Sequence, residues 1–161
     1  MKLKNIVARL RPRPAARLTI EPPKPVSVGW LIRLRCHNPG RPGSFEATVA
    51  TVRSGDSSQP RSWHVPWRHH ERCLSLDIPP GGSELLRLAI FRPNKPNPEL
   101  VLLEAIDGNP AEIRHPLQTA DGAVVTVRIR PGRAAVMERR VRLAWHVGDN
   151  GELVPDVAFV S

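Results

Sequence analysis

Tyrosine is absent from this sequence of 161 residues, and aromatic side chains make up only 4% of it. The two cysteines, Cys36 and Cys73, are too few for a scaffold held together by several disulfides. No run of about 18 apolar residues occurs, so the sequence contains no candidate for a membrane-spanning helix. Hydrophobic residues nevertheless make up 40% of the chain, which is enough to form a buried core.

Catalytic motifs are missing as well. The sequence has no Gly-x-Ser-x-Gly nucleophile elbow, and Gly81-Gly82-Ser83 lacks the lysine of a phosphate-binding loop. It contains neither a Cys-x-x-Cys nor a His-Glu-x-x-His spacing. The acidic residues are scattered singly along the chain. We therefore expect a non-enzymatic protein with no catalytic residues and no cofactor.

Proline and glycine, by contrast, are abundant, with 18 and 11 residues spread along the chain. Proline at this density excludes a helical bundle because it interrupts helices. Apolar residues instead alternate with polar ones, as in strands with one buried face. The alternation predicts about eight strands, over residues 28–36, 45–51, 74–78, 85–91, 100–106, 125–129, 136–145 and 153–160. Short strands with frequent turns predict an all-β fold, an antiparallel sandwich with Greek-key connections.

The alternation also predicts which side chains face the core. In the strand over 28–36, Trp30 and Cys36 share the inward face, and Arg33 and Arg35 point outward. A cysteine thiol buried in this way is usually inert.

The order of these features resembles a known fold family. The first features are a strand that begins with Trp30 and ends in an Asn-containing turn at 38, a second strand over 45–52, and the dipeptide Pro66-Trp67. Residues 76–81 then precede an apolar strand. Finally, Asp121-Gly122 precedes a Val/Ile strand and a basic strand that ends at Trp145. In this order the chain resembles, over roughly residues 18–147, the immunoglobulin-like sandwich domains of many uncharacterised bacterial proteins. The resemblance implies an immunoglobulin-like sandwich, which we place at 18–161, and an interaction role. It transfers no catalytic residues, and the antibody-type Cys–Trp–Cys arrangement is absent.

Most of the positive charge lies at the start of the chain. Of a net charge of +9, six basic residues without any acid lie in residues 1–17: Lys2, Lys4, Arg9, Arg11, Arg13 and Arg17. We interpret 1–17 as a short flexible arm that is attracted to polyanions such as nucleic acid or anionic lipid. A merely solvated arm is the alternative interpretation. The apolar run over residues 6–8 is too short for a secretory signal, so we expect a cytoplasmic protein with reduced thiols.

The densest cluster of chemically active side chains lies between residues 61 and 73. Its candidate binding residues are Arg61, Trp63, His64, Trp67, Arg68, His69, His70 and Arg72. Two indoles and several cations could stack bases and hold phosphate. The histidines, with Glu71 and Cys73, are also ligand types that zinc accepts. A polar surface loop whose tryptophans cover the edge of the core is the third interpretation.

Three functions therefore remain open. The first is an interaction module that binds another protein through an edge strand or the 54–73 segment. The second is a nucleic-acid-associated protein that uses the basic arm and an Arg-rich sheet face. That face would combine the outward pairs Arg33 and Arg35, Arg128 and Arg130, and Arg140 and Arg142. The third is a small metal-binding protein.

Overall fold

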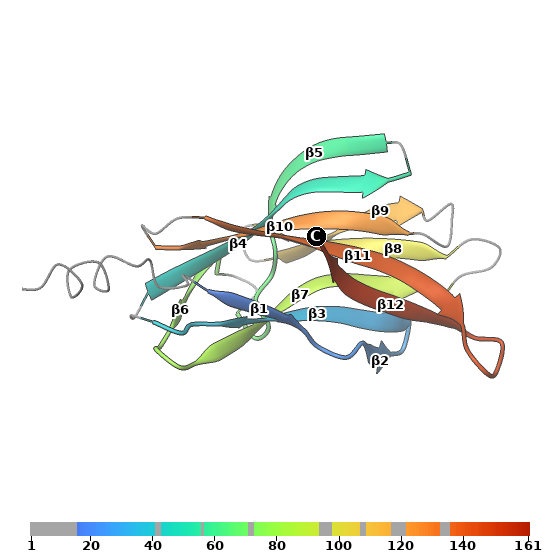
Figure 1. Cartoon of the computed structure of the whole chain (residues 1–161), viewed down its shortest axis with the longest axis horizontal. Helices are drawn as coiled ribbons and strands as arrows, with labels where there is room; N and C mark the ends of the chain where they lie inside the picture. The colour runs from blue at the N-terminus through green and yellow to red at the C-terminus, as the bar shows by residue number, and fades with distance from the viewer. Residues whose placement is uncertain are drawn as a thin grey trace, which may run out of the picture.

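The computed structural model describes residues 16–40, 43–55, 57–70, 73–93, 98–106, 109–116, 122–132 and 136–161. Within these ranges the chain forms twelve strands and no helix, so no described helix could cross a membrane. The strands make two antiparallel sheets of six strands each, which form the two layers seen in Figure 1. The prediction of an all-β antiparallel sandwich is therefore confirmed.

The strand order shows how the chain distributes its strands between the two sheets. The first sheet runs β1-β3-β7-β8-β9, with β2 also paired to β3, and the second runs β12-β11-β10-β4-β5, with β6 also paired to β4. The strands of the first sheet are β1 (Arg17–Ile20), β2 (Lys24–Val26), β3 (Gly29–His37), β7 (Ser83–Arg92), β8 (Glu99–Ile106) and β9 (Asn109–Pro116). Those of the second are β4 (Gly43–Ser54), β5 (Ser57–His64), β6 (Ser75–Ile78), β10 (Ala123–Pro131), β11 (Met137–Val147) and β12 (Leu153–Val160). The chain changes sheets between β3 and β4, between β6 and β7 and between β9 and β10, so both sheets enclose one interior.

Side chains from both sheets form a single hydrophobic core. Its fully buried members include Ile32, Leu34 and Cys36 from β3 and Val125, Val127 and Ile129 from β10. Trp30 and Trp145 pack against the margin of this core, and the Trp145 ring stacks on Phe91 with ring centroids 6.2 Å apart. The inward faces predicted from the alternation are confirmed for these strands.

Four of the edge strands are not predicted by the alternation, which explains why the structure has twelve strands where about eight are expected. They are β1, β2, β5 and β9. Strands of this kind pair on one side only and bury little surface, so their sequences carry less apolar alternation. The proline cluster that contains β2 and the polar segment that contains β5 are examples.

Candidate functional site

The segment with the predicted binding residues crosses from one sheet to the other. The backbone N–H of Val65 donates to the carbonyl of Ala47 in β4, at 2.9 Å. Three residues later, the N–H of Arg68 donates to the carbonyl of Leu85 in β7, at 2.8 Å. The chain between these two bonds therefore spans the sandwich and ties its sheets together.

The two tryptophans of this segment lie in the core. Trp63 is 5% exposed and Trp67 is 0% exposed. A partner outside the folded chain therefore meets no indole ring here. Beyond Trp67, the described candidate side chains that remain accessible are Arg68, which is half-buried, and His69 and His70, which are exposed.

Of the other predicted binding residues in this segment, only His64 has a described side chain. His64 is half-buried, and its Nε2 lies 2.6 Å from Glu46 Oε1. The side chain of Arg61 and the whole of Arg72 lie outside the described part of the chain. Where side chains are described, no three His, Cys, Asp or Glu residues gather in a group that could hold a metal ion.

The predicted basic arm falls almost entirely outside the described residues. Lys2, Lys4, Arg9, Arg11 and Arg13 belong to residues 1–15. Arg17 is the first residue of β1, where it is exposed and pairs in register with His37.

Exposed arginines instead gather on the outer face of the second sheet. In the described residues they are Arg53 on β4, Arg128 and Arg130 on β10, and Arg140 and Arg142 on β11. We call this surface the arginine face. Val124 on β10 pairs in register with Arg142 on one side and with Arg53 on the other. Residues opposite each other in adjacent strands share a face, so these two arginines flank Val124.

Three of these guanidinium groups are available to a partner. Arg128 Nε lies 2.8 Å from Glu138 Oε2 on the same face, and Arg140 donates to the Ser161 carbonyl. Arg53, Arg130 and Arg142 make no ion pair with another described residue. A free guanidinium presents a planar fork of donors that fits a carboxylate or a phosphate.

Arg33 and Arg35 lie in the other sheet, so the three predicted arginine pairs do not form one face. Both are half-buried and have partners in the segment between β1 and β2. Arg35 Nε lies 2.6 Å from Glu21 Oε1, and Arg33 Nη2 donates to the Pro22 carbonyl at 3.2 Å. Each of these guanidinium groups therefore has a partner, unlike those of Arg53, Arg130 and Arg142.

A bulge in β4 explains why the sequence did not reveal Arg53. β4 pairs Val49 with Val127 and Thr51 with Thr126, which leaves Ala50 as an extra residue. An extra residue reverses the alternation beyond it. Strict alternation would turn Arg53 inward, whereas the bulge turns it outward.

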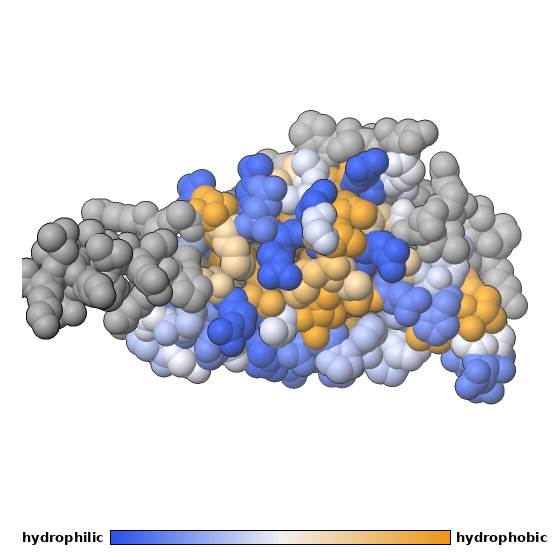
Figure 2. Space-filling view, in the orientation of Figure 1, coloured by the Kyte–Doolittle hydropathy of each residue, from blue (hydrophilic) through white to orange (hydrophobic). Residues whose placement is uncertain are grey.

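The surface around β11 and β12 carries both hydrophilic and hydrophobic side chains. In the orientation that presents β11 and β12, hydrophilic side chains are interleaved with hydrophobic ones (Figure 2). On the arginine face itself, the half-buried Val124 lies among the charged groups. This arrangement can combine ion pairing with the burial of apolar surface.

No protein-family model, no curated protein and no solved structure matches this chain. The fold and the arginine face are therefore the features from which a function can be inferred.

The two cysteines should differ sharply in reactivity. Both are free thiols, with Cys36 buried and Cys73 exposed. Burial raises the pKa of the Cys36 thiol to about 12. We expect a thiol reagent at neutral pH to modify one thiol per folded chain and two per unfolded chain. Cys73→Ser should abolish labelling of the folded protein and Cys36→Ala should leave it unchanged, so rapid labelling of both thiols before unfolding would contradict the burial of Cys36.

The same pKa shift predicts how stability depends on pH. The thiol of Cys36 ionises near 9.0 when unshifted and near 12 when folded. The unfolded chain therefore releases this proton first, and the free energy of unfolding should fall as the pH rises from about 9 toward 12. Below pH 9 the thiol keeps its proton in both the folded and the unfolded chain, so its contribution to the free energy of unfolding is fully present. Denaturant titrations at several alkaline pH values should show a smaller fall for Cys36→Ala than for the unmodified chain.

Proposed function

We propose that this protein is a non-enzymatic interaction module of the immunoglobulin-like class, which binds an acidic protein partner on its arginine face. The observation that carries the proposal is the row of Arg53, Val124 and Arg142, in which two guanidinium groups with no ion-pair partner among the described residues flank an apolar side chain. Arginine is enriched at the energetic centres of protein interfaces. Ion pairs that form next to apolar contacts are partly shielded from water, which strengthens them.

The strand order supports the immunoglobulin-like class. The runs β1-β3-β7 and β11-β10-β4-β5 have the order of strands A-B-E and G-F-C-C′ in immunoglobulin sandwiches. β8 lies next to β7, where strand D lies next to strand E in that fold. The resemblance of the sequence to sandwich domains of bacterial proteins supports the same class. The free thiols support a cytoplasmic location, where cysteines remain reduced.

Two features favour a protein over a nucleic acid as the partner. Glu46, Glu138 and Asp156 lie on the same face as the arginines and interrupt its positive charge, whereas a nucleic acid presents an unbroken row of phosphates. The indoles of Trp63 and Trp67, which could have stacked on bases, are buried. Nucleic acid is kept as a second candidate because of the basic residues in 1–17.

Pairing at the edge strand β12 is less well supported than binding on the sheet face. β12 is an edge of the second sheet, and Pro155 lies within it. Proline has no N–H to donate, so it interrupts the ladder that an added strand would need.

A pair of charge-matched variants tests the proposal. Arg53→Glu with Arg142→Glu reverses two charges on the arginine face, and Arg17→Glu with Lys24→Glu reverses two exposed charges on the first sheet. Both variants have the same net charge. Binding of a labelled polyglutamate peptide should weaken at least about tenfold in the first variant, which is about 1.4 kcal/mol. The second variant should stay within about twofold of the parent, since distant exposed charges are screened by salt.

Equal weakening in both variants would show that only net charge matters and would overturn the site. The same titrations with a DNA duplex of equal charge distinguish the two partners. If the duplex binds more tightly than the peptide and the arginine-face variant loses that binding, the nucleic-acid alternative is correct.

A further inference from the structure

Arg139 occupies a position on β11 that normally belongs to the core. It shares the inward face of β11 with Val141 and Leu143, and it pairs in register with Val127, which is fully buried. Arg139 itself is half-buried. A guanidinium at such a position loses part of its hydration and needs a compensating partner.

The only partner that the described residues offer is an aromatic ring. The Arg139 guanidinium carbon lies 4.0 Å from the ring centroid of Phe159 on β12. This cation–π contact offsets part of the free-energy cost of the lost hydration, but it leaves the N–H donors without an acceptor among the described residues. Arg139 makes no hydrogen bond or ion pair with any other described residue.

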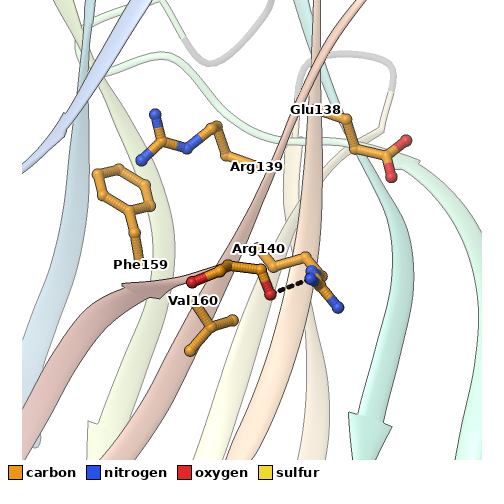
Figure 3. A pocket seen from close by; sticks show the side chains of 6 residues that line it. Glu138, Arg139, Arg140, Phe159 and Val160 are labelled. Atoms are coloured by element: carbon orange, nitrogen blue, oxygen red, sulfur yellow. Dashed lines mark hydrogen bonds between the residues drawn. The ribbon is translucent and has the colours of Figure 1, made fainter.

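A pocket of about 430 Å³ lies at this position. Its lining residues are Glu138, Arg139, Arg140, Phe159, Val160 and Ser161. Figure 3 shows Arg139 and Phe159 extending to one side of β11, while Glu138 points to the other. The neighbouring charges are already engaged, since Glu138 pairs with Arg128 and Arg140 donates to the Ser161 carbonyl. Arg139 is therefore the free charge of this pocket.

We propose that this pocket binds a small oxyanion, a carboxylate or a phosphate group, through the guanidinium of Arg139. Phe159 holds the guanidinium in place and forms an apolar wall beside it. The fork of N–H donors can take two oxygens of the anion in parallel. The volume is within the range of pockets for small organic molecules, so the group can belong to a small organic acid or phosphate ester.

Side-chain NMR of arginine-labelled protein tests the site with two probes, benzoate and inorganic phosphate. We expect a saturable shift of the Arg139 Nε resonance with at least one probe. When binding is followed by the backbone amide of Phe159, Arg139→Gln should weaken it at least about tenfold, and the control Arg17→Gln, an exposed arginine on β1, should leave it unchanged. The preferred probe identifies the source of the anion. Absence of saturation by both probes at about 50 mM, well above a millimolar Kd, overturns the proposal, as does unchanged binding by Arg139→Gln.

Thermal unfolding separates a ligand-binding role from a structural one. Arg139→Met keeps the length of the side chain and removes the unpaired charge. Without an anion this variant should melt at the same temperature as the parent or higher, because a half-buried unpaired charge does not stabilise the fold. The rise in Tm that the parent shows with the bound probe should be lost. A lower Tm without anion, together with an unchanged response to the probe, would indicate a structural residue.

Discussion

Gly122→Ala is expected to destabilise the fold by more than about 4 kcal/mol, or to prevent folding altogether. Gly122 precedes β10 and has φ of +70°. A Cβ at this position would lie 1.8 Å from the Leu143 carbonyl oxygen and 2.8 Å from the Cα of Ala144. Both atoms belong to the backbone of β11, so the clash can be relieved only by separating β10 from β11. Guanidinium unfolding followed by tryptophan fluorescence measures the loss.

Gly81→Ala is the matched control for this substitution. Gly81 has φ of +76°, and no atom lies within 4 Å of the Cβ that alanine would add. This variant should lose only the cost of a left-handed conformation in an L-residue, about 1–2 kcal/mol. Equal losses in the two variants would mean that β10 and β11 are not packed as the structure shows.

Trp67→Ala should have the second largest effect, a loss of about 3–5 kcal/mol. Trp67 is fully buried in the segment that joins the two sheets. Removing its ring leaves a cavity where the chain crosses the sandwich, and the hydrogen bonds on either side limit how far the backbone can collapse. Denaturant unfolding and near-ultraviolet circular dichroism would report the lost stability and the lost packing.

Two further variants define the cause of that loss. Trp67→Phe should cost much less than Trp67→Ala, because the indole N–H has no hydrogen-bond partner among the described residues. Leu74→Ala removes a side chain that is 41% exposed, and it should change the stability by no more than about 0.5 kcal/mol. A Trp67→Ala variant as stable as Leu74→Ala would place the ring in solvent and contradict the crossover.

Local alternation predicts the core faces well where strands are regular and fails where they bulge. On β11 it predicts that Val141, Leu143 and Trp145 share a face, and the structure agrees. On β7 it leaves two choices, the set of Leu86, Leu88 and Ile90 or its opposite. The structure buries Leu86 and Leu88 from the first set and Ala89 and Phe91 from the opposite set, while Ile90 is only half-buried.

A bulge explains this result on β7. β3 pairs Ile32 with Ala89 and Arg33 with Arg87, which leaves Leu88 without a paired residue. Leu88 and Ala89 are therefore both buried, although they are adjacent in sequence. A bulge depends on the neighbouring strand, so a period-two pattern does not reveal it.

The burial of Trp63 and Trp67 also depends on distant parts of the chain. Polar residues surround both tryptophans in sequence, which suggests an exposed loop. Hydrogen bonds to Ala47 and Leu85 instead draw this segment across the interior. Partners so distant in sequence cannot be identified from local composition.

Arg139 did carry a signal in the sequence. It lies two residues before Val141, so extending the inward set of β11 by one step places a charged residue on the core face. The arginine face, by contrast, needed the strand order as well. The sequence predicts that Arg128 and Arg142 point outward, but only the pairing of β10 with both β4 and β11 places Arg53 and Arg142 on either side of Val124.

Backbone NMR mapping of the polyglutamate complex tests the binding role of the arginine face most directly. We expect the largest amide shift changes to cluster at Arg53, Val124 and Arg142, on three neighbouring strands of the second sheet. Shift changes concentrated on β3 and β7, or spread evenly over both sheets, would contradict that role.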